Sequence, residues 1–322
     1  MSNQLARPHH ISSLNLLRGI AALSVCGFHF LSNVDVYSVK TIFSYGYLGL
    51  GLFFIISGFI IPYSMFQNKY EIQRFPKYLL KRSVRIEPPY IISFLLIILV
   101  TMIHMSINNW QYIHDWKQFG LHFFYLNQYF GYESYSIVYW TLAIEFQFYI
   151  IIGILFPLVV HAKKIYPIIL FITSSAIIWY LNLHYNWFIF QYGYLFIAGI
   201  LIFLFTVKHI SLKAFILFLS IVLCLAYFKN GVDVFLLILL ATVAIISIKR
   251  EWKITNFFGQ ISYSLYLTHM EAASWFILYT RDSFSNSLTL NIAAILFAVA
   301  FAIGFYYLFE RPAFQLSKKI KY

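Results

Sequence analysis

Charged residues are scarce in this chain of 322 residues. Only 11% of them are charged, against roughly 25% in soluble domains, and 61% are hydrophobic. No polar stretch is long enough for a separate soluble domain, so we expect residues 1–322 to form one domain embedded in a lipid bilayer. Cysteine is also scarce, and Cys26 and Cys224 both lie in apolar segments, which argues against a disulfide framework.

Long apolar runs recur from end to end of the chain, each able to cross about 30 Å of hydrocarbon. They predict an all-α, polytopic transmembrane helical bundle of about ten spans, roughly at residues 12–33, 43–66, 88–106, 138–160, 165–182, 187–206, 211–228, 232–248, 257–279 and 289–309. Residues 107–137 contain an aromatic run, GLHFFYLNQYFGY, that is too short and polar for a full span. We expect that run to be interfacial or re-entrant.

Lysine and arginine are distributed unevenly between the predicted loops. With the N-terminus placed in the cytoplasm, 19 of the 23 fall inside, and only Lys40, Lys117, Lys229 and Arg281 fall outside. The positive-inside rule then puts both termini in the cytoplasm and predicts a multi-pass protein of the inner (plasma) membrane. Topology accounts for the net charge of +12, so we expect no nucleic-acid partner.

The first apolar segment carries two ionisable residues, Arg18 and His29, in LLRGIAALSVCGFHF. On a helix they lie within about 20° of the same face and about 16 Å apart along the axis. An ionisable residue at membrane depth is costly and therefore a functional candidate. Cys26, three residues before His29, is either an acyl-carrying nucleophile or, as we prefer, a small buried residue.

A second cationic pair, Arg82 and Arg85 in KRSVRIEPPY, lies on the same predicted membrane side as Arg18. Guanidinium groups suit phosphate because they offer bidentate donors and stay charged. Three arginines at one mouth fit a polyphosphate ligand. The alternative is a pair that snorkels to lipid phosphates.

Six separated blocks resemble, in order, the motifs of the acyltransferase-3 family: LNLLRGIAALSVCGFHF, YLGLGLFFIISGFII, KRSVRIEPPY, YWTLAIEFQFY, ISYSLYLTH and FERPAF. The resemblance covers nearly the whole chain. It implies a membrane-embedded O-acyltransferase with acetyl-CoA or another acyl-CoA as donor and no metal. It also implies that the acyl group, typically acetyl, goes to a hydroxyl of an extracytoplasmic glycan or a lipid-linked saccharide.

The resemblance assigns roles to particular residues. His29 would be the general base that takes the hydroxyl proton, an effect typically worth about 10² to 10⁴ in rate. The alternative for His29 is a structural histidine that is hydrogen-bonded between helices. The CoA phosphates would be held by the three arginines. Asn15, Gly51 and Phe146 stand where the family often has acidic residues, which removes accessory carboxylates from the site.

Four other residues complete the predicted site. Glu145 either orients His29 or pairs with Arg18, and a purely structural ion pair is the alternative. We expect Trp140, Tyr149 and His269 to bind substrate, His269 on the acceptor side.

A different class of protein also fits the ionisable residues. In a polytopic transporter or flippase for an anionic or glycan substrate, the arginines and His29 would line a pathway and no bond would be made. Transporters often contain internal repeats, and we find no convincing pair of corresponding segments here.

Overall fold

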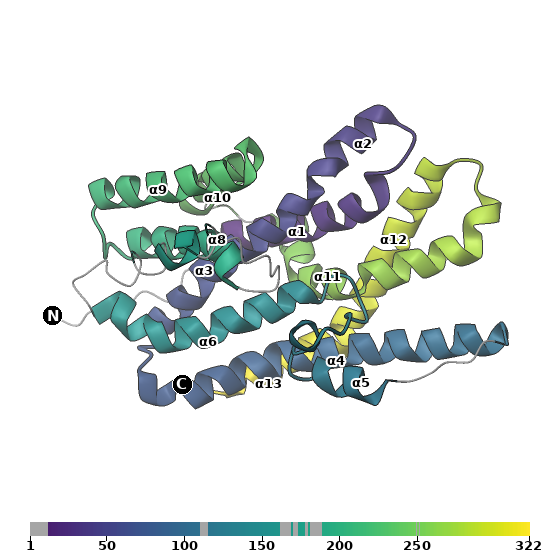
Figure 1. Ribbon diagram of the computed structural model, residues 1–322, viewed down its shortest axis with the longest axis horizontal. Helices are drawn as coiled ribbons and strands as arrows, with labels where there is room; N and C mark the ends of the chain where they lie inside the picture. Colours follow the sequence, from purple (N-terminus) through teal and green to yellow (C-terminus); the bar gives the residue numbers. More distant parts are fainter. Residues whose placement is uncertain are drawn as a thin grey trace.

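The computed structural model describes residues 12–109, 115–161, 189–248 and 252–322, together with 169, 173–177, 180 and 250. Over these ranges the chain is helical and contains no strand (Figure 1). The principal elements are α1 (Ser12–Leu31), α2 (Tyr37–Ser44), α3 (Leu48–Gln67), α4 (Phe75–Ile107), α5 (Trp116–His122), α6 (Trp140–His161), α8 (Ile189–Thr206), α9 (Leu212–Asn230), α10 (Val232–Ser247), α11 (Lys253–Thr280), α12 (Ser287–Phe305) and α13 (Arg311–Lys319). Short turns of 3-10 helix are η1 (Tyr45–Tyr47), η2 (Ile72–Arg74), η3 (Gln128–Phe130) and η4 (Arg281–Ser283), and η5 (Tyr306–Glu310) is a π-helical turn.

Seven helical stretches of the described chain are long and apolar enough to cross a membrane, which supports a multi-pass membrane protein. Helix α10 is excluded by length, since its 16 residues reach only about 24 Å. Helix α11 is long enough but carries more polar side chains. Long helices overlap nine of the ten predicted segments, and most of residues 165–182 lies outside the described residues. The exact number of spans and the side of each terminus stay predictions.

The third predicted span begins earlier than the sequence pattern indicated. It was expected to start at residue 88, but α4 starts at Phe75 and continues through Pro88–Pro89. Two prolines remove two backbone donors, and a membrane helix tolerates this where neighbouring groups compensate. In the same turn the hydroxyl of Tyr263 donates to the carbonyl of Ile86, at 2.9 Å. The paired arginines therefore lie on a helix rather than in a loop.

Glycine lets the central helices approach closely. A Cβ at Gly58 of α3 would collide with the backbone of α8, and one at Gly199 of α8 with the backbone of α3. Helices α1 and α11 meet in the same way, with Gly259 against the backbone of Asn15, whose side-chain amide donates to Asn256 at 3.0 Å. Small residues are the usual means of close helix packing in membranes.

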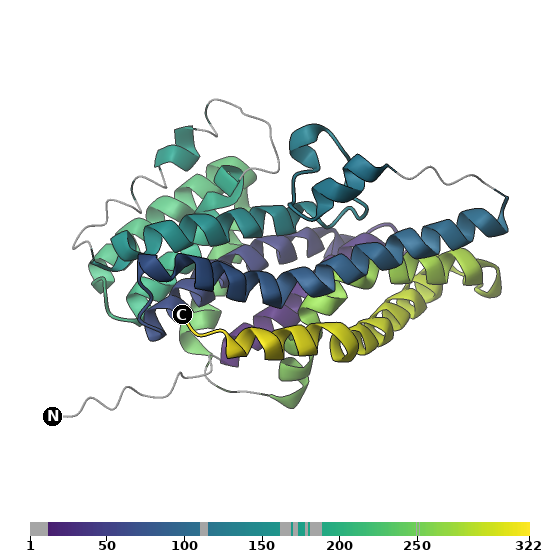
Figure 2. The same cartoon turned by 90° about the horizontal axis from the view of Figure 1, so that it is seen from below.

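Helix α1 packs against both α3 and α11 and so joins two parts of the bundle (Figures 1 and 2). On one side, α3 packs with α8, and α9 and α10 cover them. On the other, α11 packs with α12, and α13 lies along α4. The seam between α1, α11 and α12 is built largely from buried alanines: Ala22, Ala272, Ala273, Ala294, Ala298 and Ala302.

Residues 115–139, between α4 and α6, pack back against α4, where the ring of Phe94 contacts those of Phe119 and His122. The side chain of Asp115 caps the N-terminus of α5, and the buried His122 is the last residue of that helix. Nδ1 of His122 donates to the carbonyl of Gln118 at 3.1 Å, and Nε2 accepts the backbone N–H of Tyr135 at 3.1 Å. Burial lowers the pKa of His122 to about 4, so the ring is neutral, as an accepting nitrogen requires.

We expect Gly199→Ala to destabilise the protein, because the added methyl group has no space between α8 and α3. Overpacking of this kind typically costs about 1–3 kcal/mol. Gly304→Ala is the matched control, since no atom lies within 4 Å of a Cβ built there. Thermal unfolding in detergent checks the pair: an equal unfolding temperature for the two variants would contradict close packing of α3 on α8.

Candidate functional site

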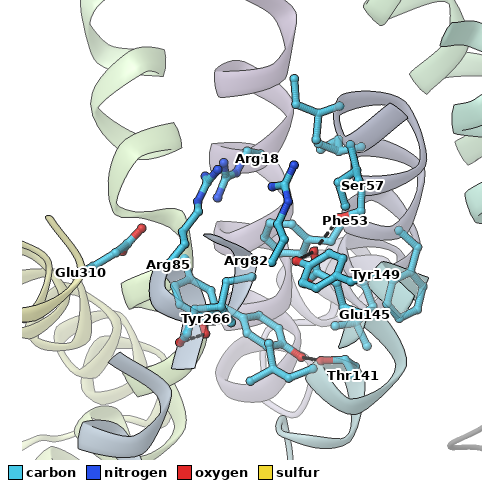
Figure 3. A pocket seen from close by; sticks show the side chains of 18 residues that line it. Arg18, Phe53, Ser57, Arg82, Arg85, Thr141, Glu145, Tyr149, Tyr266 and Glu310 are labelled. Atoms are coloured by element: carbon cyan, nitrogen blue, oxygen red, sulfur yellow. Dashed lines mark hydrogen bonds between the residues drawn. The ribbon is translucent and has the colours of Figure 1, made fainter. Parts of the chain in front are cut away.

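A cavity with an empty volume of about 910 Å³ lies where α1, α3, α4, α6, α11 and the π-turn η5 meet (Figure 3). Its polar lining is Arg18, Ser57, Arg82, Arg85, Thr141, Glu145, Tyr149, Tyr263, Tyr266 and Glu310. The remaining lining residues are apolar. A largely apolar cavity with a few convergent polar groups is typical of a small-molecule site.

Three arginines point into the same space from two helices (Figure 3). Arg18 comes from α1, and Arg82 and Arg85 share a face of α4 because they are three residues apart. Arg82 is buried, and its Nε has no hydrogen-bond partner. Among the described residues none of the three forms an ion pair with a carboxylate. In the described chain the cavity therefore holds three guanidinium groups that no carboxylate pairs.

The two carboxylates of the cavity are occupied by neutral donors instead. Oε1 of Glu145 accepts hydrogen bonds from the hydroxyls of Ser57, at 2.7 Å, and Tyr149, at 2.6 Å. Oε2 of Glu310 accepts from the backbone N–H and the hydroxyl of Ser264, at 3.0 and 2.6 Å. In each carboxylate, one oxygen thus accepts two hydrogen bonds from neutral donors.

The π-turn brings Glu310 into the cavity. Pro312, two residues later, lacks an N–H, so the carbonyl one turn before it loses its regular α-helical donor. The chain widens into the turn Tyr306–Glu310 just before it and resumes as α13. Such π-turns are common at functional sites.

The two histidines of the predicted site lie beyond the cavity wall. The ring centroids of His29 and His269 are 5.5 Å apart, and neither residue lines the cavity. The ring of Tyr266, which does line it, lies 6.0 Å from His269 and 5.6 Å from Phe53. Tyr266 thus connects the lining of the arginine cavity with the histidine pair.

The structure brings together five of the eight site residues predicted from the sequence: Arg18, Arg82, Arg85, Glu145 and Tyr149. Glu145 has different partners from those expected, because its hydrogen bonds go to Ser57 and Tyr149. Trp140 does not line the cavity. Its ring packs 5.5 Å from Tyr192.

Sequence reasoning gave no role to several residues that line the cavity. Ser57 and Glu310 stand inside the blocks quoted above, so the blocks were the available signal. Thr141 and Tyr266, whose hydroxyls are hydrogen-bonded to each other, also stand inside quoted blocks, YWTLAIEFQFY and ISYSLYLTH. Within the described ranges no cluster of three or more His, Cys, Asp or Glu gathers as a metal site.

Comparison with known proteins places the chain in a family. The family model described as an acyltransferase domain matches residues 11–311, and the chain belongs to this acyltransferase-3 family. A protein of Acidianus two-tailed virus, whose name assigns it provisionally as an acetyltransferase, is 27% identical over 286 residues. That match covers 79% of this chain and 81% of the viral protein. No solved structure matches the chain significantly.

We expect Glu310→Ala to lower stability, because the hydroxyl of Ser264 loses its buried acceptor. An unsatisfied buried group costs about 1–3 kcal/mol. Glu310→Gln keeps an acceptor oxygen and should retain most of the stability. Unfolding temperatures in detergent distinguish the two variants. An equal loss of stability in both would mean that the charge of Glu310, not its hydrogen bonds, stabilises the fold.

Proposed function

We propose that this protein is a membrane-embedded O-acyltransferase. Acyl-CoA, typically acetyl-CoA, binds from the cytoplasm with its phosphates among Arg18, Arg82 and Arg85. The acyl group is transferred to a hydroxyl of an extracytoplasmic glycan or a lipid-linked saccharide, with His29 as the general base. Membership of the family supports acyl transfer, and the charge of the cavity supports the donor.

The single observation that carries the donor proposal is the set of three unpaired guanidinium groups around one cavity. Burying a cation without a partner is costly, so such a cluster implies an anionic ligand. Even with both carboxylates of the cavity ionised, the three arginines leave a net positive charge. The phosphates of CoA supply several negative charges on one flexible molecule and suit bidentate guanidinium contacts.

The chemistry needs only one base. His29 takes the proton of the acceptor hydroxyl while that oxygen attacks the thioester carbon, and the bond from carbon to sulfur breaks. The proton then passes to the CoA thiolate, which leaves as the thiol. Cys26 is fully buried in the seam with α11 and α12, which supports direct transfer without an acyl-cysteine intermediate.

Arg18 and His29 lie at different depths along α1 and therefore serve different parts of the donor. Arg18 and His29 are separated by about 16 Å along α1, so a nucleotide held by the arginines needs an extended arm to bring its thioester to His29. The pantetheine arm of CoA is such a group. On this proposal the acyl end passes between Phe53 and Tyr266.

Replacing Arg82 or Arg85 by Ala should weaken CoA binding roughly tenfold or more, since charge-assisted phosphate contacts are each worth about 1.5–3 kcal/mol. Lys77→Ala, on the exposed face of α4, is the control and should bind CoA like the wild type. Titration of CoA into protein in nanodiscs measures both. Unchanged affinity in the Arg82→Ala, Arg85→Ala double variant would remove these arginines from the site.

His29→Ala and His29→Gln should both abolish acyl transfer while CoA binding stays nearly intact, because Gln keeps size and polarity but cannot accept the proton. His104→Gln, at the far end of α4, is the control and should keep its activity. Radiolabelled acetyl-CoA and a panel of glycans provide the assay. Acyl transfer by the His29→Gln variant at a near wild-type rate would contradict the role of His29 as general base. Glycan movement without CoA release in the wild type would favour the transporter instead.

A further inference from the structure

The protonation of His269 can be assigned from its surroundings. The residue is fully buried on α11, and its Nδ1 lies 3.0 Å from the carbonyl oxygen of Leu265 and 2.9 Å from that of Tyr266. Carbonyl oxygens only accept hydrogen bonds, so Nδ1 carries a proton. In a neutral imidazole the other nitrogen, Nε2, is then a bare acceptor.

That acceptor is an anomaly in the described structure. Nε2 of His269 is completely buried and has no hydrogen-bond partner. Buried polar atoms in proteins are nearly always paired, so an unpaired one needs an explanation. Because Nδ1 is turned back to its own helix, Nε2 points away from α11. The ring centroid of His29, on the adjacent α1, is 5.5 Å away.

His29 can supply the missing donor. Among the described residues its ring forms no hydrogen bond, and a neutral imidazole always has one N–H to give. The two carboxylates of the cavity do not donate a hydrogen bond to Nε2 of His269. Glu145 accepts hydrogen bonds from Ser57 and Tyr149, and Glu310 accepts one from the hydroxyl of Ser264.

We propose that His269 is the positioning residue of His29. Its Nε2 accepts the ring N–H of His29, which fixes His29 in one neutral tautomer and leaves the opposite ring nitrogen unprotonated toward the acceptor hydroxyl. This inference rests on the proposed role of His29 as base. His269 touches none of the reacting atoms and keeps its own Nδ1 proton throughout the reaction.

The arrangement has the logic of a base oriented by a second group, with a neutral acceptor in place of a carboxylate. A neutral partner fixes the ring without adding a buried negative charge next to His29. The proton that His29 takes from the hydroxyl goes on to the CoA thiolate, so His269 neither gains nor loses a proton. Its effect is exerted through the orientation of His29 alone.

The first test does not depend on activity. Nitrogen-15 histidine labelling of the full chain in lipid bilayers reports which ring nitrogen of His29 carries the proton, and the His29 signals are assigned by their loss in His29→Gln. We expect a single neutral tautomer in the wild type and in His269→Gln, which retains an acceptor. In His269→Phe we expect both tautomers. Identical His29 signals in wild type and His269→Phe, or a mixture already in the wild type, would overturn the proposal.

The second test uses acyl transfer and CoA binding together. His269→Phe should lower the rate roughly ten- to hundredfold with unchanged CoA affinity, as expected when a partner that orients a reactive group is lost. His269→Gln should recover much of that loss. Thr268→Val is the control, since the Thr268 hydroxyl bonds only to its own helix. Equal rates for His269→Phe and wild type would contradict the positioning role. If no variant, the wild type included, transfers an acyl group, the proposed function fails, and the tautomer measurement still decides the role of His269.

Discussion

Three guanidinium groups that share one cavity inside an apolar bundle are the constraint on which the site depends. Their charge would ordinarily be cancelled by the nearest carboxylates, and two carboxylates line the same cavity. Ser57, Tyr149 and Ser264 occupy those carboxylates with neutral hydrogen bonds, which leaves the arginines without an ion pair in the described structure. A site assembled in this way keeps a net positive charge that an anionic ligand can neutralise.

Close helix packing holds that cavity in place. Helix α1, which carries both Arg18 and His29, is fixed between α3 and α11 by contacts that glycine makes possible, as at Gly259. Because α1 is rigid over this length, the arginine end and the histidine end keep a constant separation of about 16 Å. The rings of Phe53 and Tyr266 line the cavity, and that of Tyr266 also lies 6.0 Å from His269. In the proposed reaction, this aromatic pair is what the acyl group has to pass.

Much of the fold could be predicted from local pattern. Long apolar runs have to form helices in lipid, because unpaired backbone groups are too costly there, and nine predicted segments overlap observed helices. Helix ends were less predictable. The sequence suggested that Pro88–Pro89 would begin a helix, but α4 starts at Phe75 and runs through them, as helices in membranes can. Whether the segment over residues 165–182 adds a span lies outside the described residues.

The candidate residues could be identified from spacing alone, because Arg18 and His29 fall on one helix face and Arg82 and Arg85 fall on one face of another helix. Their partners depend on the tertiary structure. The hydrogen bond that Glu145 accepts from Ser57 of α3, the position of Glu310 in a π-turn at the cavity, and the approach of His269 to His29 all depend on how distant helices pack. The physical reason is that helix periodicity sets the direction of a side chain on its own helix, while its partner is set by whichever helix packs against that face.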